Sequence, residues 1–99
     1  MTSTRTPEVN ALLARAEQAE HRAARLATLA ANHHPRPSMP PAPAAVADMD
    51  DDWVLACEEA MPPIAQAQVA ILAVLEAQAA RRLASTLNRA RTTTRGDQP

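Results

Sequence analysis

The 99-residue chain contains no phenylalanine, tyrosine or lysine, and it has one glycine, one cysteine and one tryptophan. Because Gly96 is the only glycine, neither a glycine-rich phosphate loop nor a nucleophile elbow can form. A lone Cys57 excludes an internal disulfide. The shortage of aromatic rings also removes the stacking surfaces that many nucleic-acid-binding proteins use.

The apolar side chains that are present are mostly small. Alanine occurs 24 times, whereas leucine, isoleucine and valine together occur 16 times. Alanine strongly favours helix but buries little apolar area. A chain of this size with so thin a core is marginal as a monomer. We therefore predict a single all-α domain that gains stability from oligomerisation or from a partner.

The first helix is predicted over residues 7–31, after a disordered N-terminus over residues 1–6. Thr6 suits the N-cap, and Pro7 suits the first helical position. Apolar residues then recur with an unbroken 3-4 spacing, which is the pattern of a heptad seam. The seam consists of Val9, Leu12, Ala16, Ala19, Ala23, Leu26 and Ala30. Its small side chains allow another helix to approach closely.

A proline-rich linker is predicted over residues 32–47, where five prolines exclude regular helix and favour an extended chain. Its length leaves open whether the first helix packs within its own chain or on a neighbouring one. The following region, 48–91, should be helical and kinked at Pro62-Pro63, since the residue before a proline avoids helix. It forms either two separate helices or one strongly kinked helix. Residues 92–99 should form a disordered tail. The expected fold is a helical hairpin or small bundle of two long helices and one short helix.

The long helix after Pro63 carries most of the large apolar residues. Over residues 69–75 they cover nearly the whole circumference, and such a helix is expected to be buried on all sides. The alanine seam of the first helix cannot cover so much surface. We therefore predict a non-enzymatic protein–protein interaction module (a small subunit, adaptor or regulator) that self-associates through this helix or binds a helical partner. The predicted interface residues are Trp53, Ile64, Val69, Ile71, Leu72, Leu75 and Leu83.

Charge is strongly segregated along the chain. Residues 1–47 contain five arginines and three glutamates, residues 48–80 contain seven acidic residues and no basic one, and residues 81–99 contain five arginines and one aspartate. An antiparallel hairpin would bring Arg22 and Arg25 to the acidic start of the second helix, and Glu8 to the arginines from 81 to 91. Head-to-tail pairing of two chains would use the same pattern.

The C-terminal arginines also support an alternative function, accessory nucleic-acid binding, since arginine side chains contact phosphates. The candidate anion or nucleic-acid contacts are Arg81, Arg82, Arg89 and Arg91. No helix-turn-helix spacing accompanies them, and an acidic segment precedes them.

No metal or cofactor site is predicted. The aspartates between residues 48 and 52 lack the central glycine of an EF-hand loop, and they suit a helix N-terminus instead. The remaining candidate ligands are His21, His33, His34 and Cys57. They lack the close pairing that zinc sites show.

No enzyme function is predicted either. Cys57 has no neighbouring histidine in sequence to activate it as a nucleophile. Glu58 and Glu59 are adjacent on a helix, so their side chains point in different directions and do not form a paired-carboxylate acid–base site.

A cytoplasmic location without membrane contact is expected. Residues 1–10 lack the apolar region of a secretory signal. The longest uninterrupted apolar run, Val69–Leu75, is far shorter than the roughly 20 residues that span a bilayer. The exclusive use of arginine with abundant alanine and proline suits a GC-rich bacterial genome.

The helix–linker–helix order with a central tryptophan resembles the architecture of the helical hairpin proteins secreted by type VII systems. That family carries Trp-x-Gly at its turn, where this chain has Trp53-Val54-Leu55. Its Tyr-x-x-x-Asp/Glu tail signal requires a tyrosine, which this chain lacks. The resemblance is therefore confined to architecture and assigns no family.

Overall fold

The computed structural model describes residues 6–32 and 35–96, with side chains as far as residue 91. This part of the chain contains three α-helices, one short 3-10 helix and no β-strand, so the all-α prediction is confirmed. The elements are α1 (Pro7–Ala31), η1 (Val46–Asp48), α2 (Asp51–Ala60) and α3 (Pro63–Gly96).

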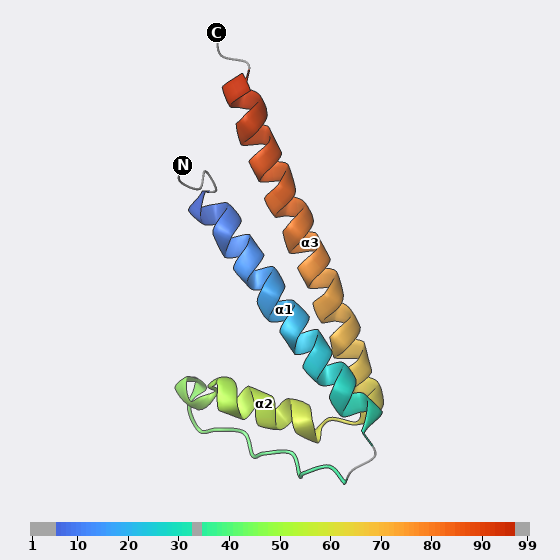
Figure 1. Cartoon of the computed structure of the whole chain (residues 1–99). Helices are drawn as coiled ribbons and strands as arrows, with labels where there is room; N and C mark the ends of the chain where they lie inside the picture. The colour runs from blue at the N-terminus through green and yellow to red at the C-terminus, as the bar shows by residue number, and fades with distance from the viewer. Residues whose placement is uncertain (1–5, 33–34, 97–99) are drawn as a thin grey trace.

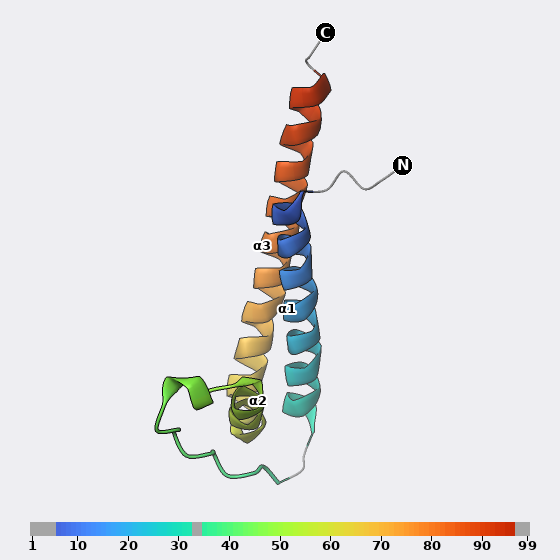
Figure 2. The same ribbon diagram turned by 90° about the vertical axis from the view of Figure 1, so that its left-hand side faces the viewer.

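Helices α1 and α3 lie side by side and antiparallel, and α2 projects from the end where α1 finishes and α3 begins (Figures 1 and 2). The extended linker leaves the end of α1, runs along α2 and leads through η1 to the start of α2 (Figure 1). Because α3 has 34 residues and α1 has 25, the C-terminal turns of α3 continue beyond the start of α1.

Local signals in the sequence explain where the helices begin and end. The hydroxyl of Thr6 accepts a hydrogen bond from the Val9 amide (3.2 Å), and Pro7 opens α1. The Asp50 carboxylate accepts one from the Trp53 amide (2.9 Å) and caps α2. Met61, which precedes Pro62, is extended, so α2 and α3 are separate helices.

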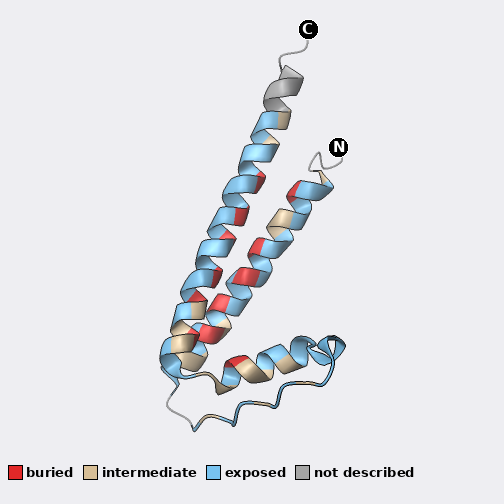
Figure 3. Ribbon diagram, turned by 180° about the vertical axis from the view of Figure 1, so that it is seen from behind, coloured by how far each residue is buried: buried red, intermediate tan, exposed pale blue. Residues whose placement is uncertain are grey.

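The core is a contact between two alanine-rich seams (Figure 3). On α1 the buried residues are Val9, Ala16, Ala19, Ala23 and Leu26, while Leu12 and Ala30 are half-buried. On α3 they are Gln66, Ala70, Ala73, Ala77, Ala80 and Ala84, with a regular 4-3-4-3-4 spacing. Leu26 is the only large apolar side chain with less than 2% exposure in the described residues. The core is therefore filled by two helices that lie close together, and not by large side chains between them.

Ion pairs flank this contact on both sides. Arg15 Nε donates to Glu76 Oε2 (2.8 Å), and these residues directly precede Ala16 and Ala77. On the opposite side Arg81 forms a bidentate pair with Glu20, at 2.6 and 3.0 Å. Exposed pairs such as these contribute little to stability, because water and salt screen the two charges. Their main effect is to favour the antiparallel orientation.

Several sequence-based expectations about element boundaries need correction. The sequence predicts a linker without helix to residue 47, but η1 forms one turn over Val46–Asp48, beyond the last linker proline, Pro43. It also predicts a disordered tail from residue 92, but α3 continues to Gly96. Extending an existing helix fixes one residue at a time, and no proline interrupts residues 92–95. Residues 1–5 and 97–99 lie outside the described part of the chain.

The expected charge contacts are also partly wrong. Arg22 and Arg25 bind Glu58, in the last turns of α2, rather than the aspartates at its start. The Pro62-Pro63 joint holds the C-terminal end of α2 against α1 while its acidic start projects away (Figure 1). Glu20, rather than Glu8, pairs with an arginine of α3, Arg81.

Candidate functional site

The outward face of α3, defined here as Ile64, Ile71, Leu72, Val74 and Leu75, lies away from the alanine seam. Four of these residues are more than half exposed, from 52% for Leu75 to 71% for Ile64. The expectation that the helix is buried on all sides is therefore wrong for the single chain, because the seam of α3 is made of alanine and the large residues lie outside it. A folded chain exposes these side chains to water unless another surface covers them.

An alanine groove between α1 and α3 adjoins this face. It has a volume of about 840 Å³ and lies on the Glu20 side of the helix pair. Its α1 wall consists of Glu20, Ala23, Ala24, Ala27, Ala30 and Ala31. Its α3 wall consists of Ala67, Ala70, Ile71, Val74 and Leu75. Ile71, Val74 and Leu75 belong to both surfaces, so the groove and the outward face form one continuous apolar region.

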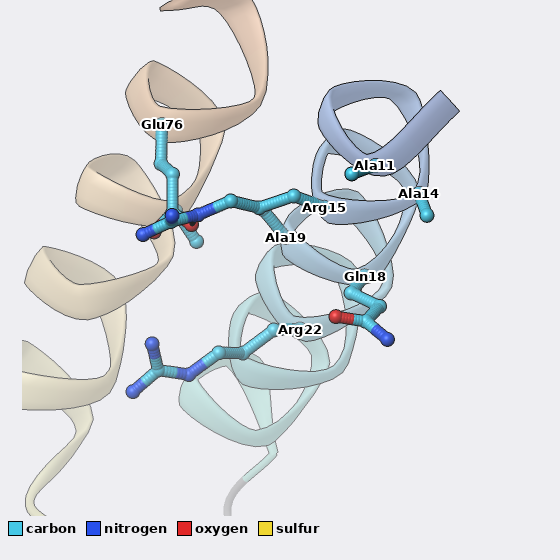
Figure 4. Close-up of a pocket in the computed structure, with 8 residues that line it drawn as sticks. Ala11, Ala14, Arg15, Gln18, Ala19, Arg22 and Glu76 are labelled. Carbon is cyan, nitrogen blue, oxygen red and sulfur yellow. Dashed lines mark hydrogen bonds and ion pairs between the residues drawn. The ribbon is translucent and has the colours of Figure 1, made fainter. Parts of the chain in front are cut away.

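A second groove, of about 530 Å³, lies on the other side of the helix pair (Figure 4). Arg15 reaches across it from α1 to Glu76 on α3, and Arg22 extends in the same direction. Both guanidinium groups are already paired, Arg15 with Glu76 and Arg22 with Glu58. The groove therefore offers an anion no unopposed positive charge from either arginine.

Glu58 fastens α2 to the helical hairpin. Its side chain is 6% exposed, and its carboxylate accepts hydrogen bonds from Arg22 Nε (2.6 Å) and from Arg25. Its backbone carbonyl accepts one from the buried Gln66 Nε2 (2.8 Å). Burial alone would raise the pKa of Glu58, but the hydrogen bonds and charges of Arg25 and Arg22 outweigh it and lower the pKa. The neighbouring Glu59 is exposed, so the two carboxylates do diverge.

Glu58→Gln should lower the free energy of unfolding by about 1–2 kcal/mol, because two arginines lose their charged partner. Urea unfolding followed by circular dichroism measures this loss, and Glu59→Gln is the matched control on the exposed face. Since folding lowers the pKa of Glu58, its stabilising contribution is complete above the ordinary glutamate pKa of about 4.3. The contribution is lost as the pH falls through the lowered value. An equal difference between variant and wild type at neutral and strongly acidic pH would contradict this role.

Trp53, a predicted interface residue, is half-buried against the linker. Its indole Nε1 donates a hydrogen bond to the Pro41 carbonyl oxygen (3.1 Å). This contact ties the start of α2 to the proline-rich segment. Trp53 thus lies on α2, away from the outward face of α3 (Figure 1).

The other predicted interface residues lie along α3. Four of them belong to the outward face, namely Ile64, Ile71, Leu72 and Leu75. Leu83 is half exposed nearer the C-terminal end of the helix, and Val69 is half-buried. The structure therefore brings four of the seven predicted residues together on one exposed surface.

The predicted interface residues omit Val74, although it belongs to the apolar stretch 69–75, and the alanine groove was not predicted. The available signal is the 4-3-4-3-4 spacing of Gln66 and the alanines of α3. This spacing marks the seam, and so it shows which large residues lie outside it.

The C-terminal arginines do not form one cluster. Arg81 is paired with Glu20, so it faces the flank of the helix pair. Arg89 Nη2 lies 3.4 Å from Ser85 Oγ, and Arg91 Nη2 donates to Asn88 Oδ1 (3.1 Å). Arg82 and Arg89 are both exposed, seven residues apart on one face of α3. Two of the four candidate contacts therefore share a solvent-facing surface.

Two further properties bear on function. By length and composition alone, the segment Pro63–Arg91 of α3 would be able to cross a membrane, a test that core helices of soluble proteins also pass. Among residues 6–32 and 35–96, no three histidine, cysteine or acidic side chains gather where they would hold a metal ion. His33 and His34 lie outside the described residues. Cys57 is half-buried and its thiol is free.

Comparisons of this chain with protein-family models, with curated proteins and with solved structures find no match. Its function is therefore inferred from its own residues and their arrangement.

Proposed function

We propose that this chain is a non-enzymatic helical protein–protein interaction module that self-associates through α3. The observation that supports the proposal is that α3 buries its small apolar side chains and exposes its large ones, the opposite of what a helix in a stable core does. Alanines occupy its buried seam, whereas Ile64, Ile71, Leu72 and Leu75 are more than half exposed. Covering such side chains is the main favourable term in protein association.

The rest of the fold suits docking of another helix. The alanine groove is lined almost entirely by apolar side chains, and its small alanines leave room for a partner helix to approach both α1 and α3. The same surface would complete a small bundle, which is the usual way in which a thin helical core becomes stable.

Energy transfer between labelled chains tests this proposal. Two samples of the full chain, labelled at the N-terminus with donor and acceptor dyes, should show energy transfer on mixing, and excess unlabelled chain should remove it. A labelled Leu72→Asp variant should not transfer energy, because it places a carboxylate on the outward face. Absence of transfer at all accessible concentrations would overturn the proposal.

The alternative, nucleic-acid binding, has less support in the structure. Arg81 is engaged by Glu20, which leaves Arg82 and Arg89 as the exposed pair on α3. Nucleic-acid binding would give an affinity that falls steeply with salt, whereas an apolar protein interface would not. A mobility shift at low salt that neutralisation of Arg82 and Arg89 abolishes would favour this alternative.

A further inference from the structure

We infer that two copies of the chain pair antiparallel along α3, about a two-fold axis at the level of Ala73, with Ile71 of each copy against Leu75 of the other. This inference rests on the proposed self-association. It adds the occupant of the outward face, the direction of the helices and their register.

The order of residues along the outside of α3 supports this register. One stripe faces directly away from the alanine seam and repeats its 4-3-4-3-4 spacing. Over residues 63–83 it consists of Ile64, Gln68, Ile71, Leu75, Gln78 and Arg82, all of them exposed, and it continues to Ser85 and Arg89. A 3-4 repeat is symmetric about several centres, and the centre at residue 73 is the one that places the apolar Ile71 against Leu75. In an antiparallel pair, residues equally far from the centre face each other, so each position of the stripe meets another position of the stripe.

The chemistry of the stripe also matches across this centre. Ile71 meets Leu75, so the two innermost layers are apolar. Gln68 meets Gln78, and amide side chains can donate to and accept from each other. Ile64 meets Arg82, whose methylene stem can cover an apolar side chain while the guanidinium stays in water.

The residues beside the stripe strengthen the centre of the contact. Leu72 and Val74 lie on its two flanks, each one residue from the proposed axis, and both are exposed. An antiparallel two-fold brings each of them close to its own counterpart. Val74 also lines the alanine groove, so its flank of the stripe adjoins that groove.

Charge favours the antiparallel direction. A parallel pair would place the arginine-rich ends of both α3 helices together. In the antiparallel register, residues 63–83 of the two copies overlap, and Arg89 is carried past Pro63 of the other copy. The exposed Glu59 lies near that end of α3, at the C-terminal end of α2, whereas Asp51 and Asp52 lie at the far end of α2, which projects away. Separation of the two arginine-rich ends therefore favours the same direction as the stripe.

Cysteine cross-linking tests the register. In a full-length Cys57→Ser background, Gln68→Cys and Gln78→Cys are prepared separately, mixed and oxidised gently. Both positions are exposed, so neither change disturbs the hairpin core. The mixture should give a disulfide-linked dimer of twice the 10.6 kDa chain mass as the main product, and neither variant alone should do so. Gln18→Cys on α1, mixed with Gln78→Cys, is the control that should stay unlinked.

The outcomes separate this inference from the proposed function. Efficient linking of Gln68→Cys to itself would indicate parallel helices and overturn the inference. Energy transfer between wild-type chains without the mixed disulfide would overturn the register and leave self-association standing. A chain that shows neither energy transfer nor linking would overturn both.

Discussion

Ala16→Leu is expected to lower the melting temperature by roughly 10 °C or more. Ala16 is fully buried where α1 contacts Ala77 and Ala80 of α3, and no space remains for three additional carbon atoms. Overpacking of a close contact costs about 1–3 kcal/mol. In a domain of this size each 1 kcal/mol corresponds to roughly 4–8 °C. Thermal unfolding followed by circular dichroism measures the shift.

Ala14→Leu is the matched control for this prediction. Ala14 lies two residues away on the same helix and is exposed, so leucine there meets no opposing helix. Its melting temperature should stay close to that of the wild type. If both variants melted at the wild-type temperature, the close alanine contact between α1 and α3 would be contradicted.

Leu75→Asp is expected to weaken self-association by roughly 100-fold or more. Each copy of a symmetric pair would bury a carboxylate without a hydrogen-bond partner, at a cost of about 3 kcal/mol for the pair. Leu75 is 52% exposed in the single chain, so the change leaves the hairpin contact intact. Light scattering over a concentration series measures the dissociation constant.

Val46→Asp is the control for this second prediction. Val46 is also a large exposed apolar residue, at 81%, but it lies on η1 rather than on α3. Its variant should associate like the wild type. Equal weakening by both changes would indicate nonspecific hydrophobic association, and no weakening by Leu75→Asp would exclude the outward face as the interface.

Much of the fold follows from local signals in the sequence. Thr6 and Pro7 mark the start of α1, and Pro62 separates α2 from α3, because capping and proline geometry act over a few residues. The 3-4 spacing on α1 marks the face that packs. These features need no knowledge of the rest of the chain.

The division of α3 into two faces is harder to predict. Large apolar residues and alanines are interleaved over residues 69–75, so composition alone indicates burial on every side. Which side faces α1 depends on the helix register, and the alanines decide it because they permit the closest approach. The contacts of Glu58 depend on the direction in which α2 leaves the Pro62-Pro63 joint, which is a tertiary property. The sequence therefore indicates a surplus of apolar surface but not its position.

Sedimentation equilibrium of the wild-type chain over a wide concentration range tests the central claim most directly. Self-association through α3 predicts a weight-average mass that rises with concentration from the 10.6 kDa of one chain to twice that value. A mass that stays at 10.6 kDa throughout, in a chain that remains fully helical, would contradict the claim.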